Sequence, residues 1–89
     1  METRLDRVME AIISEPNTFG CVFAEGQGLC LGTKGEASNE SAGIITAIAE
    51  QAAKLEPRNK DPIIVFENNS KKCIIHRQGT ITAAYYKNI

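Results

Sequence analysis

Residues 42–55 have the sequence AGIITAIAEQAAKL, and this stretch decides how the rest of the chain is interpreted. Wound at about 3.6 residues per turn, it predicts a helix with one face of branched side chains, Ile44, Ile45, Ile48 and Leu55, and a flank of small ones, Ala42, Thr46, Ala49 and Ala53. A surface helix needs one apolar stripe to cover its own core. We therefore expect the branched face to pack on a sheet and the small flank to receive a partner helix. The alternative is that alanine serves helix propensity and that the flank is partly solvated.

The strand expected after this helix also carries more apolar surface than one sheet covers. Residues 63–66 read IIVF and are apolar on both faces, and Pro62 before them is compatible with an edge strand. An exposed apolar edge is an aggregation hazard unless another strand pairs with it. We therefore expect the helix and the strand to form one partner interface. Its predicted residues are Ala42, Ile45, Thr46, Ala49, Ala52, Ala53, Ile63, Ile64, Val65 and Phe66.

Hydrophobic periodicity and turn residues predict the remaining elements. Residues 5–13 repeat apolar side chains at helical spacing, and Pro16 ends that helix. Further strands are expected at 19–24, 29–33, 72–77 and 80–87, a polar connection at 56–61, and an N-cap of the second helix at Ser38 or Asn39. Short turns between neighbouring strands imply antiparallel pairing. The order αββαβββ predicts an α+β fold in which two helices cover one face of a five-stranded antiparallel sheet.

Size and composition limit the classes of protein that fit the chain. Its 89 residues and 9.7 kDa predict a single domain, residues 1–89. A net charge of −1 and a pI near 5.8 argue against a nucleic-acid module. Three cysteines, an odd number, indicate the reducing cytosol. No run approaches the roughly 20 apolar residues of a membrane span, so we expect any membrane association to come from a partner and not from direct insertion.

Few residues offer catalytic or metal chemistry. Cys21, Cys30, Cys73 and His76 form the one Cys₃His combination that the chain contains. Cys73 and His76 are three residues apart, so in a strand they point to opposite faces, and buried cysteines usually act as small apolar residues. With one histidine and no nucleophile motif, a catalytic triad is not indicated. We expect no catalytic, cofactor-binding or metal-ligating residues; a small thiol- or metal-dependent protein is the less favoured alternative.

Several short motifs resemble a known family over essentially the whole chain. They are residues 27–32 (QGLCLG), Gly35, Ser38, Ala42-Gly43, residues 51–55 (QAAKL) and residues 79–82 (GTIT). These motifs resemble the roadblock-type Ragulator subunits that include the hepatitis B virus X-interacting protein. The roadblock/longin-like fold that the resemblance implies has the order αββαβββ, and its subunits pair through their second helix and third strand.

The resemblance also implies a function. It implies a scaffold subunit that forms a heterodimer with another roadblock subunit and joins other Ragulator subunits at the lysosomal surface. There the complex engages Rag GTPases in amino-acid signalling to the mTOR kinase complex. The protein would then be cytoplasmic and recruited to the lysosome through its partners. A dynein light-chain-type roadblock adaptor, which would form homodimers, is the alternative within the same fold.

Overall fold

The computed structural model describes residues 3–58 and 61–89, and within them it confirms the predicted order of elements. The elements are α1 (Arg4–Ile13), β1 (Thr18–Glu25), β2 (Leu29–Gly35), α2 (Ser41–Leu55), β3 (Ile63–Glu67), β4 (Lys71–Gln78) and β5 (Ile81–Asn88). Residues 59 and 60 of the predicted polar connection lie outside the described residues.

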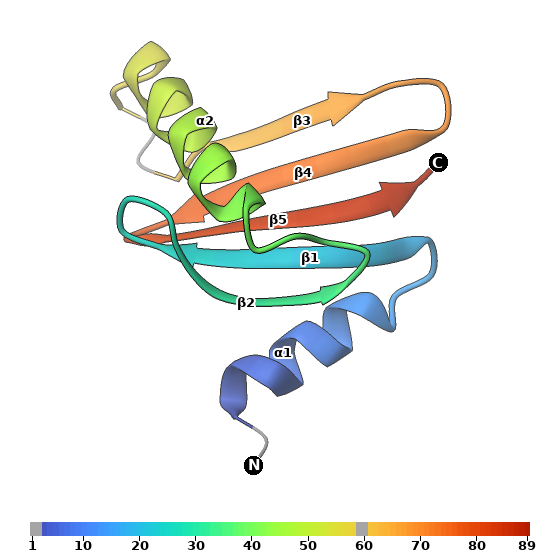
Figure 1. Ribbon diagram of the computed structural model, residues 1–89. Coiled ribbons are helices and arrows are strands. Elements are labelled where there is room, and N and C mark those ends of the chain that lie inside the picture. Colours follow the sequence, from blue (N-terminus) through green and yellow to red (C-terminus); the bar gives the residue numbers. More distant parts are fainter. Residues whose placement is uncertain (1–2, 59–60) are drawn as a thin grey trace.

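The five strands form one antiparallel sheet in the order β2-β1-β5-β4-β3 (Figure 1). The strand β3 therefore lies at an edge, as Pro62 predicted. The opposite edge is β2, where the register with β1 shifts. Phe23 pairs with Gly32 and Ala24 with Cys30, so Leu31 has no partner across the ladder. This bulge interrupts the β2 edge, whereas the pairing of β3 with β4 is regular along its whole length.

The two helices pack on opposite faces of the sheet, so the expectation that both cover one face is wrong. Side chains alternate along β1, which places Cys21 on one face and Val22 on the other, both with 0% exposure. α1 covers the first face through Met9, and α2 covers the second through Ile45. Figure 1 shows α2 crossing one face of the sheet and α1 lying beside β2. The physical reason is that β1 is apolar on both sides and needs cover on both.

The ends of the helices follow local sequence signals only in part. α1 begins with a capping box, in which the Thr3 hydroxyl accepts a hydrogen bond from the Asp6 N–H and the Asp6 carboxylate accepts one from the Thr3 N–H. α2 begins later than predicted, with Glu40 and not Ser38 or Asn39 at its N-cap. The Ser38 hydroxyl accepts from the Glu40 N–H instead, in the turn before the helix.

The start of α2 lies close to the turn that joins β1 and β2. A Cβ added at Gly28 would lie 2.7 Å from the Cα of Gly43, so only glycine at position 28 permits this approach. The contact fixes where the helix crosses the sheet. Within the described residues, no helix combines the length and the apolar content that crossing a bilayer requires.

Candidate partner interface

The face of α2 that packs on the sheet is largely the small flank that we predicted for a partner, together with Ile45. The inward stripe consists of the buried Ala42, Ile45, Thr46 and Ala49 and the half-buried Ala52 and Ala53. These are the six helix residues that we expected to meet a partner, and the structure turns them toward the chain's own sheet. The sheet beneath them is also built from small side chains, such as Ala24 and Ala84, so the helix packs most closely with its alanines inward. The Thr46 hydroxyl is satisfied by donating to the Ala42 carbonyl at 2.8 Å.

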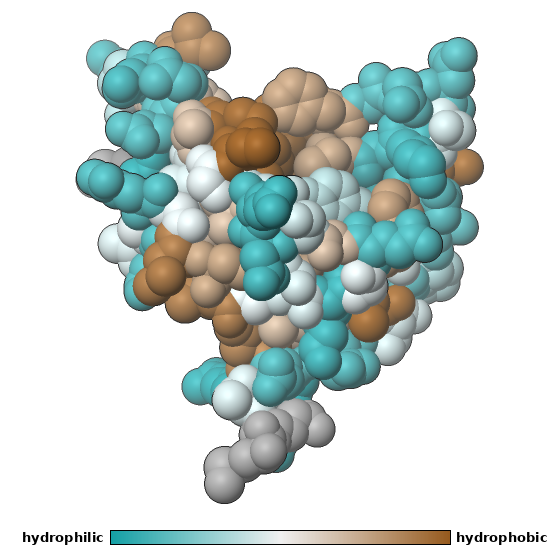
Figure 2. Space-filling model, viewed as in Figure 1, coloured by the Kyte–Doolittle hydropathy of each residue, from teal (hydrophilic) through white to brown (hydrophobic). Residues whose placement is uncertain are grey.

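Two branched residues of α2, Leu55 and Ile44, point away from the sheet, whereas Ile48 is half-buried at the margin of the core. Leu55 is 86% exposed and Ile44 is 63% exposed. With Ala47, Ile48 and Gln51 they form what we call the outer stripe, because their spacing keeps them on one side of the helix. Figure 2 shows hydrophobic atoms gathering where this side of α2 approaches β3. An apolar stripe of this kind is unusual on a free surface and indicates a contact site.

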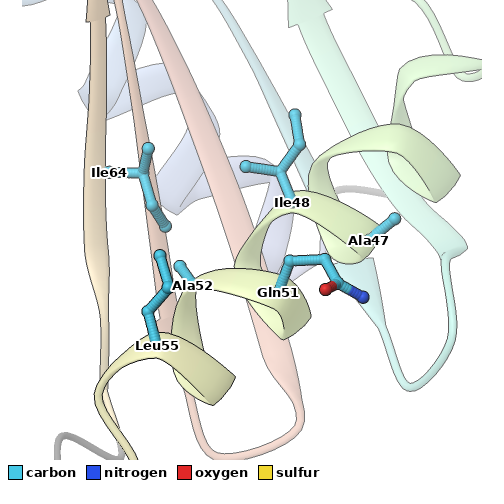
Figure 3. Close-up of a pocket in the computed structure, with 6 residues that line it drawn as sticks. All are labelled: Ala47, Ile48, Gln51, Ala52, Leu55 and Ile64. Atoms are coloured by element: carbon cyan, nitrogen blue, oxygen red, sulfur yellow. The ribbon is translucent and has the colours of Figure 1, made fainter.

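A shallow apolar pocket joins the outer stripe to β3. Its volume is about 390 Å³, and it is lined by Ala47, Ile48, Gln51, Ala52, Leu55 and Ile64 (Figure 3). Gln51 supplies the one polar side chain among these residues. In Figure 3, Ile64 extends from β3 toward the helix, so the pocket is shared between the two elements. A pocket of this size and lining can hold a large apolar side chain of another protein.

Hydrogen bonds at the two ends of β3 show which backbone groups face the open edge. At one end the Arg77 N–H donates to the Pro62 carbonyl at 3.1 Å, and at the other the Asn68 N–H donates to the Lys71 carbonyl at 2.9 Å. In an antiparallel ladder, hydrogen-bonded pairs recur at every second residue. The residues of β3 that bond to β4 are therefore the even-numbered ones.

The odd-numbered residues of β3 consequently offer their backbone to another strand. Ile64 and Phe66 use their N–H and C=O groups in the ladder with β4. The same groups of Ile63, Val65 and Glu67 point out of the sheet, where none of the strands that the structure describes lies. The edge therefore has donors and acceptors in the alternation that a second antiparallel strand requires.

The side chains of β3 remain exposed on both faces of the sheet. Ile63 is 61%, Val65 52% and Phe66 51% exposed, while Ile64 is half-buried against the core under α2. The strand portion of the predicted interface therefore lies at an accessible edge, next to the outer stripe. Whether a partner binds there stays a prediction.

The cysteines and the histidine do not come together. Cys73 packs in the core under α2, whereas His76 pairs with Ala83, which belongs to the core under α1. Burial raises the pKa of the Cys21 thiol and of the Cys73 thiol, which disfavours the thiolate that metals and electrophiles need. In residues 3–58 and 61–89, no group of three or more His, Cys, Asp or Glu side chains is placed to hold a metal ion.

Comparison with known proteins identifies the family of the chain. The family model described as Ragulator complex protein LAMTOR5 matches residues 1–87. The chain belongs to the LAMTOR5 family. The Ragulator complex protein LAMTOR5 homolog of Nematostella vectensis is a LAMTOR5 relative that is 33% identical over 88 residues, covering 98% of this chain and 97% of that protein. The Ragulator complex protein LAMTOR5 of Xenopus tropicalis is 31% identical over the same length and coverage.

Solved structures confirm the roadblock fold of this LAMTOR5-family chain. A roadblock/LC7 domain from Streptomyces avermitilis superimposes with a TM-score of 0.84 at 16% identity, covering 97% of this chain and 79% of that one. Myxococcus xanthus MglB superimposes with a TM-score of 0.83 at 14% identity, covering 97% and 76%. At these identities the likeness shows the fold alone.

The sequence analysis missed the outer stripe as a candidate site. It assigned Ile44, Ile48 and Leu55 to the chain's own core because branched residues usually fill cores. That assignment is wrong for the exposed Ile44 and Leu55, whereas Ile48 does pack against the core under α2. A signal against that assignment was present in the strands. Ala24 and Ala84 supply little side-chain volume to the face under α2, and a helix can approach such a face closely only through small residues.

Proposed function

We propose that this LAMTOR5-family chain is a non-catalytic scaffold subunit, a single roadblock-type domain that pairs with another roadblock-type subunit. The proposed interface is the outer stripe of α2 together with the open edge of β3. One observation carries this proposal: an exposed apolar helix face and an unpaired strand edge adjoin and share a pocket. Either feature alone is a liability in water, and one partner of the same fold can cover both at once.

The geometry supports a pairing in which two sheets join along β3. A partner strand laid antiparallel to β3 meets the outward backbone groups of Ile63, Val65 and Glu67. The partner's helix then lies along the outer stripe, and one of its large apolar side chains fills the pocket lined by Ile48 and Leu55. Strand pairing sets the register of this contact, and the pocket adds affinity.

The cellular part of the proposal rests on family membership. As a counterpart of the Ragulator subunit that is also called hepatitis B virus X-interacting protein, the chain would join other Ragulator subunits at the lysosomal surface. There the complex would help engage Rag GTPases in amino-acid signalling to the mTOR kinase complex, and a lipidated partner would supply the membrane anchor. The match to the LAMTOR5 model over residues 1–87 favours this role over that of a dynein light-chain-type adaptor.

A pair of proline substitutions tests the interface. In Val65→Pro the lost N–H is one that faces the open edge, so the isolated chain keeps its ladder with β4 while the affinity for the roadblock partner falls at least about tenfold. The matched control is Ile64→Pro, which removes a ladder bond, leaves its acceptor on β4 unsatisfied and lowers the free energy of unfolding of the isolated chain by roughly 1–3 kcal/mol. The measurements are calorimetric titration with the partner and urea unfolding of the chain alone.

Amide hydrogen exchange gives an independent readout on the unmodified protein. The Val65 amide is expected to exchange freely in the isolated chain and slowly in the pair, whereas the Ile64 amide is protected in both. Unchanged exchange at Val65 on mixing, together with unchanged affinity of Val65→Pro, would exclude β3 from the interface.

A further inference from the structure

The residues of β3 that offer their backbone to a partner strand also present a row of three side chains beside it. Ile64 lies on the α2 face of the sheet, so the alternation of the strand places Ile63, Val65 and Glu67 on the other face. Ile63 and Val65 are more than half exposed, and Glu67 is exposed as well. A strand added at this edge therefore meets two apolar side chains followed by a carboxylate.

A second copy of this chain does not match that row. In a two-fold pair the strands run antiparallel, and their outward backbone groups bond only when odd-numbered residues face odd-numbered residues. One register keeps all five residues of β3 paired, and it sets Val65 opposite Val65 of the copy. The same register sets Ile63 opposite Glu67, and the two-fold axis repeats this mismatch.

Sliding the two copies along each other does not remove the mismatch. A shift of two residues in one direction brings Glu67 opposite Val65, and a shift of two in the other brings it opposite Asp61, a second carboxylate. A shift of four residues sets Glu67 against Glu67 of the copy. Cross-strand pairs of opposite charge stabilise a sheet and pairs of like charge destabilise it. In each of these registers, Glu67 therefore lacks a favourable partner.

The even-numbered side chains of β3 do not oppose self-pairing. In the register that pairs all five residues, Phe66 lies opposite Ile64 of the copy, and both side chains are apolar. Apolar pairs of this kind contribute favourably in a sheet. Discrimination against a second copy therefore depends on Glu67.

The charges around Glu67 indicate which partner residue suits it. Lys72 lies opposite Glu67 on β4, and Lys87 lies beyond Lys72 on β5. A partner residue opposite Glu67 is one strand spacing, about 4.8 Å, from the glutamate but two spacings, roughly 10 Å, from Lys72. The Debye length is about 8 Å at physiological salt, so repulsion from Lys72 is largely screened there. A basic side chain is therefore favoured opposite Glu67.

We propose that Glu67 determines which roadblock subunit pairs with β3. It disfavours a second copy of this chain and selects a strand with a basic side chain opposite Glu67 and an apolar one opposite Ile63. The inference rests on the proposed function, because it specifies the partner of the strand edge assigned there. It also separates this chain from an adaptor that forms homodimers, since the same edge strand would then have to pair with itself.

Self-association of the full chain tests the inference without any partner. In Ile63→Lys, each new ammonium lies opposite Glu67 of the copy, whereas the matched control Ile63→Glu places a carboxylate there. Both variants lose the same apolar side chain, so their difference reports the charge alone. By sedimentation equilibrium we expect the dimer Kd of Ile63→Lys to be at least about tenfold lower than that of Ile63→Glu. Equal association of the two variants, or its absence in both, would overturn the inference.

The roadblock subunit that copurifies with this chain supplies a second arm. Glu67→Gln is expected to raise the Kd for that subunit about fivefold in calorimetric titration, with a smaller difference at high salt. The matched control is Glu25→Gln, which removes the same charge at the end of β1, away from the β3 edge, and should leave the Kd unchanged. An unchanged Kd in Glu67→Gln would refute the role of Glu67 even where Val65→Pro loses the partner, and retention of the partner by Val65→Pro would instead refute the proposed interface.

Discussion

Leu55→Ala separates the role of the outer stripe from the stability of the fold. Leu55 is 86% exposed, so truncating it removes almost nothing from the core of the isolated chain. Full burial of a leucine side chain contributes about 1.5–3 kcal/mol, so covering the exposed 86% contributes about 1.3–2.6 kcal/mol to association. At about 1.4 kcal/mol per tenfold change, the Kd for the roadblock partner should rise roughly 10- to 70-fold.

The assay is calorimetric titration of each variant with the purified roadblock partner, with urea unfolding of each variant alone. The chain offers a control of the same residue type in Leu29→Ala. Leu29 is 68% exposed but lies on β2, at the opposite edge of the sheet. We expect Leu29→Ala to leave the Kd unchanged and both variants to unfold within about 0.5 kcal/mol of the parent. A Kd for Leu55→Ala within twofold of the parent, or an equal change in both variants, would refute the assignment of the outer stripe.

Three other predictions follow from the packing and the pKa shifts. Ala49→Glu places an unpaired carboxylate where the native side chain has 0% exposure, at a cost of several kcal/mol, so the isolated chain should lose most of its circular dichroism signal at 25 °C. Thr3→Ala removes the N-cap of α1 and should lower the free energy of unfolding in urea by about 1 kcal/mol at neutral pH. The hydrogen bonds from Thr3 lower the pKa of Asp6, so the part of the stability that the Asp6 carboxylate contributes is present above pH 3.8 and is lost as the pH falls below it; the difference between Thr3→Ala and the parent should narrow there. Burial raises the pKa of the Cys21 thiol above 9.0, so the stability that the neutral thiol contributes is complete below that pH and is lost as the pH rises further. In urea unfolding at high pH, the free energy of unfolding should therefore fall less steeply with pH in Cys21→Ala than in the parent.

The order of elements and the edge position of β3 could be predicted because they depend on local signals. Helical spacing in residues 5–13, the double-sided apolar run at 63–66 and Pro62 each specify one element without reference to the others. Those elements appear in the structure within two residues or so of the expected bounds. Short connections then leave antiparallel pairing as the natural arrangement of the later strands.

The faces of the helices could not be predicted in the same way, because they depend on which surface each helix meets. Periodicity shows that Ala49 and Ile44 lie on different sides of α2, but not which side faces the sheet. The choice is made by the volume of side chains such as Ala84 on the strands, which is a tertiary property. The placement of α1 on the far side of β1 is likewise determined by the two-sided burial of that strand.

The bulge in β2 has a consequence for the size of the assemblies that this protein can form. A sheet with two regular free edges can add subunits at both ends, and a head-to-tail series of that kind grows into a filament. In this chain, Leu31 has no partner in the ladder and bends the β2 edge, so regular pairing is offered at β3 alone. Pairing along β3, as proposed, would therefore leave no equally regular edge for a further strand, which disfavours growth into a filament.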